Sequence, residues 1–412
     1  MKAADTPKGG RRAALLLAVI TPVIAELTLG NPPLSRIWLM LLWIPIYGAG
    51  TVLIRELVRR RRGGWPSILL LGLAYGIVEE GLVLQALSSP TMYGVAGWAP
   101  RFLGLNTAYA ELNLPYHAVF SVALPILLAD LAFPSLRDRP YLKRTGVVVA
   151  GVVFVLGGLL LRITVATSID PGYQAPVAVM AGCVAAVALL AVVALRVLPP
   201  TASDAPTAPA TPGAREASPA PDAPPVPATS ATPAAPTARG ASAASESTVD
   251  GTRVGAVPGS WVVGVFGVLA GFGYLALLFP FGGAGQPAFT HGGWVAAPML
   301  GAAVVALSAG WLVRRWTRSG GWTDRHGLCL AGGALAGHTA FGVVANAATL
   351  ADKLELSTLG LVMVGLLALL VRRRPASMPM KSPEKDSSVR CRERRHGSDS
   401  PAKAKRTGAG HA

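Results

Sequence analysis

The chain has 412 residues, of which 52% are hydrophobic and 14% are charged, and its mean hydropathy is +0.48. Soluble domains carry about 25% charged residues, so this composition excludes an ordinary soluble globular protein. The formal net charge is +16, but the basic residues fall in short clusters between apolar runs and in the C-terminal segment. This distribution is typical of membrane topology, whereas a nucleic-acid-binding protein gathers its basic residues on one folded surface. We therefore expect the lipid bilayer, and no nucleic acid, as a partner.

Long apolar runs follow one another along most of the chain. A run of about 17–25 such residues can cross the hydrocarbon core of a bilayer as a helix. The predicted spans are Ala13–Gly30, Ile37–Ile54, Ser67–Leu87, Tyr116–Phe133, Gly146–Leu161, Ala175–Leu198, Ser260–Phe279, Gly293–Val313, Gly327–Leu350 and Leu356–Val371. The sequence therefore predicts an all-α fold, a polytopic transmembrane helical bundle of about ten spans.

The basic clusters predict how the bundle is oriented. With ten spans, the clusters at 59–62, 137–144 and 314–325 fall on the same side as both termini. Loops rich in Lys and Arg stay in the cytoplasm, so we expect both termini to be cytoplasmic. The abundance of Ala, Gly, Pro and Arg is typical of a GC-rich bacterium, which predicts a location in the bacterial plasma membrane.

The spans fall into two blocks, six spans in residues 1–198 and four in residues 259–372. Residues 199–258 between the blocks are rich in Pro, Ala, Thr and Ser. Such a segment cannot bury enough apolar surface to offset its ordering entropy, which predicts a disordered linker. Residues 373–412 are predicted to form a disordered basic tail. Its Lys and Arg are expected to contact anionic headgroups, with a solvated tail that has no target as the alternative.

Two adjacent glutamates, Glu79 and Glu80, lie inside the third predicted span. A carboxylate at the bilayer centre costs about 2.5–3.5 kcal/mol on insertion scales, so an intramembrane pair indicates a functional site. The predicted orientation places His117, which opens the fourth span at its outer edge, and His338 and Asn346 of the ninth span, at comparable depths. We expect these five residues to converge in one polar chamber in the outer half of the membrane.

Two further acidic residues lie within the spans. Glu26, in the outer half of the first span, is expected to join the polar chamber. Asp130 lies in the inner half of the fourth span, so we expect it to lie apart and to pair with Arg137 or Arg139.

The five residues of the expected polar chamber, from Glu79 to Asn346, would place carboxyl groups beside imidazole rings, and this combination allows two kinds of chemistry. Such a carboxyl group can take a proton from water as a general base, with or without a divalent metal. It can equally relay protons in a transporter. His338 follows a row of small residues, so an interhelical hydrogen bond is as good an account of it as catalysis.

The order of these residues resembles the CAAX-processing and bacteriocin-immunity family of intramembrane peptidases. That family has a Glu-Glu-x-x-x-Arg motif, then Phe-x-x-x-His, then His-x-x-x-Asn, and its Glu and His residues are thought to activate water against a peptide bond. The resemblance assigns these roles to Glu79, Glu80, His117, His338 and Asn346. The sequence departs from the family at the Arg and Phe positions, and it places the Asn eight residues after His338 rather than four.

The sequence is compatible with three functions. We rank a water-activating intramembrane hydrolase first, with Glu79, Glu80, His117, His338 and Asn346 as its catalytic residues. A proton-coupled transporter or permease is the second, and a structural or accessory membrane protein is the third. The sequence identifies no substrate.

Overall fold

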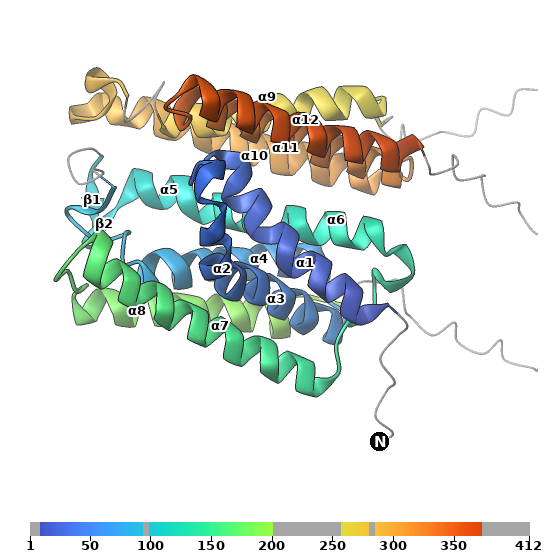
Figure 1. Ribbon diagram of the computed structural model, residues 1–412, viewed down its shortest axis with the longest axis horizontal. Helices are drawn as coiled ribbons and strands as arrows, with labels where there is room; N and C mark the ends of the chain where they lie inside the picture. Colours follow the sequence, from blue (N-terminus) through green and yellow to red (C-terminus); the bar gives the residue numbers. More distant parts are fainter. Residues whose placement is uncertain (1–8, 94–98, 201–256, 280–284, 373–412) are drawn as a thin grey trace, which may run out of the picture. The chain divides into compact units, whose positions relative to one another are not determined.

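The computed structural model describes residues 9–93, 99–200, 257–279 and 285–372, and these ranges are almost wholly helical (Figure 1). The predicted linker and basic tail fall largely on residues 201–256 and 373–412, which lie outside the described residues. Both therefore stay predictions.

Within the described ranges, ten helices are long and apolar enough to cross a membrane. The first spanning helix comprises α1 (Gly10–Ala25) and η1 (Leu27–Leu29), and the second comprises η2 (Leu34–Leu39), α2 (Met40–Trp43), η3 (Ile44–Gly48) and α3 (Ala49–Arg60). The third comprises α4 (Trp65–Gly76) and η4 (Ile77–Val83), and the fourth comprises α5 (Thr107–Tyr116), η6 (His117–Ala123) and α6 (Leu124–Ala132). The fifth comprises α7 (Arg144–Thr164) and η8 (Val165–Ile169), and the sixth comprises α8 (Val177–Val192) and η9 (Val193–Val197). The last four are α9 (Ser260–Leu278), η12 (Gly292–Val295) with α10 (Ala296–Arg318), α11 (Asp324–Ala345) and α12 (Leu350–Arg372). The predicted all-α, multi-pass membrane fold is confirmed.

Short elements connect some of these helices. The 3₁₀ turns η7 (Pro134–Leu136) and η11 (Pro287–Phe289) lie in loops. The strands β1 (Arg101–Phe102) and β2 (Leu105–Asn106) form a small antiparallel hairpin before α5. Both residues of its turn, Leu103 and Gly104, have positive φ, which a tight two-residue hairpin of this type needs.

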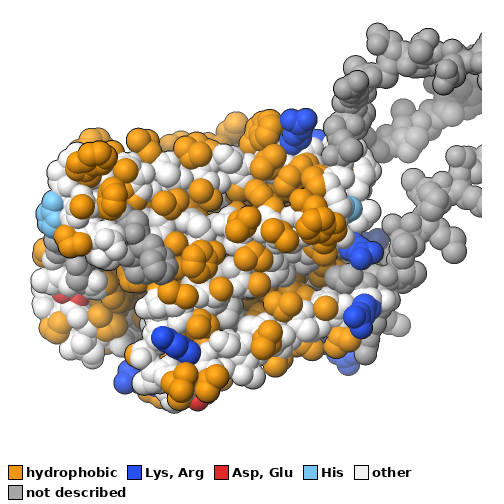
Figure 2. Space-filling view, turned by 90° about the horizontal axis from the view of Figure 1, so that it is seen from above, with side chains coloured by type: hydrophobic (Ala, Val, Ile, Leu, Met, Phe, Trp, Pro, Cys, Tyr) orange, Lys and Arg blue, Asp and Glu red, His pale blue; other side chains and the backbone are white. Residues whose placement is uncertain are grey.

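The outer surface of the bundle is apolar. Val148 on α7, Leu307 on α10 and Leu361 on α12 are 64%, 73% and 74% exposed. In water such a surface would be a liability, but lipid tails are as apolar as these side chains. Figure 2 shows hydrophobic side chains over the middle of one face, with most of the visible Lys and Arg toward one end. This arrangement fits a bundle whose middle lies in the bilayer core.

Several basic segments that are distant in sequence lie together at one end of the bundle. Arg60, at the end of α3, donates to the backbone oxygen of Leu142 at 2.6 Å. Arg137, in the loop after α6, pairs with Asp324 at the start of α11 at 2.8 Å. The up-and-down order of the helices thus groups these basic ends, as alternating loops should. We call this end of the bundle the basic end.

Helices α9 and α11 are in close contact through glycines. A Cβ atom added to Gly333 would lie 2.0 Å from the backbone oxygen of Gly264, and one added to Gly337 would lie 2.3 Å from that of Val268. Small residues at a membrane helix interface allow the two backbones to approach closely, which increases van der Waals packing where there is no hydrophobic driving force. The small-residue face of α11 is therefore used for packing.

A buried ionic network at the basic end joins α3 to α6. Asp130 pairs with Arg55 at 2.7 Å and with Arg59 at 2.9 Å. The prediction that Asp130 pairs with Arg137 or Arg139 is wrong, because these two residues offer their backbone oxygens to the Arg55 guanidinium instead. Arg55 and Arg59 are four residues apart on α3 and so project from one face toward α6.

Tyr141 completes the network. Its hydroxyl donates to Asp130 at 3.0 Å, and its ring lies under the Arg55 guanidinium, 3.3 Å from the ring centroid. Burial, and then the Asp130 carboxylate, raise the pKa of Tyr141 above its ordinary range, so the hydroxyl stays protonated and acts as a donor. A buried charge needs such partners because an unpaired one is strongly destabilising.

The fourth spanning helix begins earlier than predicted, at Thr107 rather than Tyr116. Asn106 caps this helix, since its side chain accepts a hydrogen bond from the Tyr109 amide at 2.9 Å. At about 1.5 Å of rise per residue, His117 lies roughly 15 Å inside the helix. The placement of His117 at the outer edge of its span is therefore wrong, and this depth allows it to reach the buried glutamates.

Candidate functional site

Glu79, Glu80 and His117 meet in the interior of the first six helices and form what we call the carboxylate–imidazole cluster. Glu80 Oε1 lies 3.2 Å from His117 Nε2, and Glu79 Oε2 lies 3.4 Å from His117 Nδ1. All three residues are buried, with 2–4% of their surface exposed. The two carboxyl groups therefore flank one imidazole ring, one at each nitrogen.

The helices that carry the cluster are π-helical where the cluster forms. Both glutamates lie in η4 and His117 opens η6. In η4 the Leu84 amide donates a hydrogen bond to the backbone oxygen of Glu79, five residues earlier, at 2.7 Å. Such π segments are uncommon and occur frequently at functional sites. The widened turns place two adjacent glutamates against a single ring without making both point at the same atom.

Hydroxyl groups hold the cluster in place. The Tyr109 hydroxyl donates to Glu80 Oε2 at 2.9 Å, and Ser121 Oγ lies 3.0 Å from His117 Nδ1. Ser121 is one helical turn after His117 and is itself fixed, because its backbone oxygen accepts from the Thr51 hydroxyl at 2.8 Å. Glu80 and His117 thus have defined positions and partners.

Glu79 is less well satisfied than Glu80. Its Oε2 atom is buried and has no hydrogen bond of good geometry from any described residue, and the same is true of the buried Tyr75 hydroxyl. Nearly all buried polar atoms in folded proteins have a partner, so each exception needs an explanation, such as a water molecule or a catalytic role. The two groups are neighbours that interact with each other, although their hydrogen-bond geometry is poor.

A third carboxyl group, that of Glu26, borders the cluster as expected. Glu26 lies at the end of α1 and accepts a hydrogen bond from the Tyr47 hydroxyl. Tyr47 lies in η3, a further π-helical segment, and its ring centroid is 6.1 Å from that of His117. Glu26 interacts electrostatically with Glu79 and His117.

His338 is fully buried but has partners of its own. Its Nδ1 lies 3.0 Å from Thr28 Oγ1, and its Nε2 lies 2.9 Å from the Tyr116 hydroxyl. The Thr28 hydroxyl donates to the backbone oxygen of Ile24, and the Tyr116 hydroxyl donates to that of Ala25. Each hydroxyl oxygen can therefore accept from the ring, and a neutral ring donates to one of them from its protonated nitrogen. Phe120 stacks on the ring with centroids 4.5 Å apart. These contacts tie α11 to the first and fourth spanning helices.

Asn346, at the end of α11, also makes a structural contact, since its side chain donates to the backbone oxygen of Leu29 at 2.8 Å. In the part of the chain that the structure describes, no hydrogen bond or ion pair links His338 or Asn346 to the carboxylate–imidazole cluster. Tyr116 stands between the two regions, with its ring centroid 5.6 Å from those of both His117 and His338. Of the five predicted site residues, the structure thus brings three into direct contact.

The cluster does not have the arrangement of a mononuclear metal site. Glu79 and Glu80 face opposite nitrogens of the His117 ring, so the three groups do not converge on one point. Across the described ranges, no group of three or more His, Cys, Asp and Glu side chains is positioned to hold a metal ion. The residues present therefore do not fit one metal bound by all three groups, and we assign no chemistry to a metal.

Sequence reasoning missed the hydroxyl-bearing neighbours of the cluster. Tyr47, Tyr75 and Tyr109 come from three different spanning helices, and nothing in their spacing links them to the glutamates. Ser121 is the exception, because its position four residues after His117 on a helix indicates that the two side chains share a face.

Comparison with known proteins supports the membrane assignment. A family model described as an uncharacterized membrane protein family matches residues 15–216. No curated protein and no solved structure matches the chain. The matched segment carries Glu79, Glu80 and His117 and ends before His338. Over just under half its length, the chain is therefore similar to a membrane protein family, and its helices make it a multi-pass membrane protein.

Proposed function

We propose that the protein is an intramembrane hydrolase whose carboxylate–imidazole cluster activates water against a carbonyl-containing bond of a membrane-embedded substrate. The observation that carries the proposal is Glu79 Oε2, a buried carboxylate oxygen 3.4 Å from His117 Nδ1 that makes no hydrogen bond of good geometry with a described residue. The hydroxyls of Tyr47 and Tyr75 lie close enough to interact with the same carboxyl group. A water molecule that donates to this oxygen would satisfy it and would lie where a general base can deprotonate it.

The step assigned to the cluster is a balanced hydrolysis. Glu79 takes a proton from water as the water oxygen forms a bond to the carbonyl carbon. The bond from that carbon to the leaving nitrogen or oxygen then breaks, and the leaving atom receives the proton that Glu79 carried. His117 orients the water and Glu79, and Glu80 fixes the His117 ring through its 3.2 Å contact with Nε2. In the peptidase family that the sequence resembles, Glu and His residues are thought to act in this way.

His338 and Asn346 have a supporting part in this proposal. Both make their contacts with α1, η1 and Tyr116 rather than with the cluster. They hold α11 against the helices that carry the cluster, so we propose them as positioning residues.

The test uses full-length protein in lipid nanodiscs, a library of synthetic transmembrane peptides and oxygen-18-labelled water. We expect wild-type protein to generate new peptide C-termini that carry the label. Glu79→Gln and His117→Ala should lower this rate about 100-fold or more, in the range typical of a lost general base. Glu111→Gln, which removes the same charge from α5, serves as the matched control and should keep the rate.

Two results would contradict the proposal that the protein is a hydrolase. One is the absence of labelled products from wild-type protein, and the other is an unchanged rate in both cluster variants. A shared loss in the Glu111→Gln control would show that the variants act through folding, and it too would count against the proposed role of Glu79.

A proton relay is the second candidate, and the arrangement of the titratable groups favours it specifically. Glu80, His117 and Glu79 follow one another at 3.2 and 3.4 Å, and Glu26 with Tyr47 lies beside them, so these groups come from four spanning helices. Vesicles that hold the protein and a pH-sensitive dye distinguish the two functions. A relay predicts proton flux under an imposed potential that Glu80→Gln abolishes, whereas a hydrolase predicts none.

A further inference from the structure

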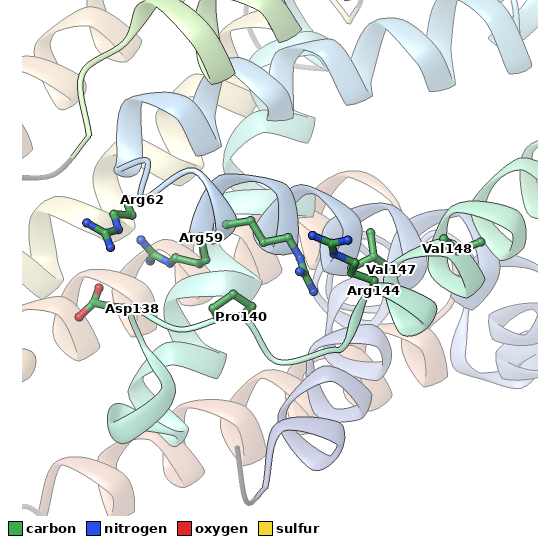
Figure 3. Close-up of a pocket in the computed structure, with 8 residues that line it drawn as sticks. Arg59, Arg62, Asp138, Pro140, Arg144, Val147 and Val148 are labelled. Carbon is green, nitrogen blue, oxygen red and sulfur yellow. The ribbon is translucent and has the colours of Figure 1, made fainter. Parts of the chain in front are cut away.

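An open pocket of about 670 Å³ lies at the basic end of the bundle, between the end of α3, the loop after α6 and the start of α7. Four arginines line it, Arg59, Arg60, Arg62 and Arg144, against one acidic residue, Asp138. Figure 3 shows Arg59 and Arg62 on one side and Arg144 on the first turn of α7. The excess of positive charge makes an anion the expected ligand.

Two of the four guanidinium groups are fixed in place by the fold. Arg59 is held by Asp130 at 2.9 Å and by the backbone oxygen of Gly63 at 3.3 Å. Arg60 is held by Glu56 at 3.4 Å, in addition to its bond to the loop after α6. Because these side chains are already ordered, an anion that binds them loses little conformational entropy.

Arg59 also has an unused hydrogen-bond donor. Only 7% of the residue is exposed, and its Nε atom is buried with no acceptor in the described part of the chain. A buried charged donor without an acceptor is costly, and a phosphate oxygen is the type of acceptor that a guanidinium binds best. Arg59 lines the pocket, so its guanidinium has hydrogen-bonding capacity there that the described residues do not use.

The start of α7 adds a second source of positive potential. Arg144 is the first residue of this 21-residue helix, and the preceding Lys143 places no side-chain cap on the helix amides. Free amides and the helix dipole favour an anion at such an N-terminus. The four arginines and the N-terminus of α7 thus all contribute positive potential to the same pocket.

The position of the pocket along the bundle indicates where the anion comes from. Val147 and Val148 form its far edge, and Val148 is 64% exposed. The same face of α7 continues with exposed Val149 and Val152. The pocket therefore opens where the charged end of the bundle meets its lipid-facing surface, which is the level of the headgroups.

We propose that this pocket binds the phosphate of an anionic lipid headgroup, with the acyl chains lying along the apolar face of α7. Basic pockets between membrane helices are suited to such headgroups. The site is separate from the predicted basic tail and from the carboxylate–imidazole cluster, so it does not depend on the proposed function.

The experiment measures lipid binding by native mass spectrometry on full-length protein purified in a neutral detergent. The probes are phosphatidylglycerol, phosphatidylcholine and inorganic phosphate. We expect phosphatidylglycerol to bind at least tenfold more tightly than phosphatidylcholine, and the double variant Arg62→Gln/Arg144→Gln to lose this preference. The matched control is Arg314→Gln/Arg318→Gln, which removes the same charge from the end of α10 and should keep the preference within about twofold.

Three outcomes would overturn the proposal. Equal affinity for the two lipids would remove the anionic preference, and equal losses in both double variants would assign the effect to net charge rather than to the pocket. Displacement of the lipid by an equal concentration of inorganic phosphate would show that the pocket takes free phosphate. Both pairs of arginines are exposed, so the variants are expected to fold.

Discussion

Asp130 is a buried carboxylate on which two buried guanidinium groups depend. Asp130→Asn keeps the shape of the side chain but removes the charge that Arg55 and Arg59 share. Arg59 then has no acidic partner among the described residues, and Arg55 keeps only Glu56, at 3.9 Å. Breaking a buried pair in this way costs about 3–5 kcal/mol. We expect a loss of this size in the free energy of unfolding in detergent.

The control for Asp130 is Asp138→Asn, in the exposed loop after α6. A surface substitution of this kind changes stability by less than about 0.5 kcal/mol. Equal losses in the two variants would contradict a structural role for the buried network and would indicate a general effect of charge at this end of the bundle.

His338 and His117 are both buried imidazoles, but we predict opposite consequences when each is replaced. His338→Ala removes contacts to Thr28, Tyr116 and Phe120 and leaves a cavity, so we expect it to lower the free energy of unfolding by about 2–3 kcal/mol. Its rate of peptide hydrolysis, measured below the melting temperature, should stay within a few-fold of wild type. A variant of normal stability that lacks activity would instead make His338 catalytic.

The cost of burying charge explains which site residues could be predicted. Glu79 and Glu80 were identifiable because carboxyl groups are rare in apolar spans, so their position alone carries information. Tyrosines are ordinary in such spans, so Tyr47 and Tyr109 gave no comparable indication. Whether His338 reaches the glutamates depends on how α11 packs, which no spacing along the chain specifies.

At the scale of elements, substitutions at two neighbouring glycines of α11, Gly333 and Gly332, test how closely α9 and α11 pack. Gly333→Ala would place a methyl group 2.0 Å from the backbone oxygen of Gly264, so α9 and α11 must move apart. Overpacking of this kind costs about 1–3 kcal/mol. We expect a lower melting temperature in detergent for this variant.

The neighbouring glycine provides the comparison. A Cβ at Gly332 would meet its nearest heavy atom, on Leu367, at 3.6 Å, which is an ordinary contact. Gly332→Ala should therefore be neutral, or stabilising by up to about 1 kcal/mol through better helix propensity. If both variants are equally stable, the close contact between α9 and α11 is not rigid.

Helix existence and helix boundaries were not equally predictable. All ten spans could be located because a membrane helix must satisfy its backbone internally and present apolar side chains to lipid, which gives a strong pattern. The start at Thr107 was missed because Pro115 resembles a boundary. In the structure this proline lies inside the helix, and the Glu111 oxygen that it leaves free accepts a hydrogen bond from Tyr274.

For the whole molecule, the alternation of basic and neutral loops predicts which end faces the cytoplasm. The structure groups basic segments at one end of the bundle. The positive-inside rule predicts that this end faces the cytoplasm. Single cysteines in a background without the native ones test it. Arg61→Cys and Ser319→Cys lie in basic turns, whereas Phe102→Cys and His291→Cys lie in the opposite loops.

A membrane-impermeant maleimide applied to intact cells should label the Phe102→Cys and His291→Cys proteins and leave the other two unlabelled until the cells are permeabilised. Each pair has one member in the first six spans and one in the last four, so the two blocks are tested together. The reverse pattern would invert the orientation without changing the fold. Labelling of one member of each pair would be more serious, because it requires an odd number of crossings between positions that a ten-span bundle places on the same side.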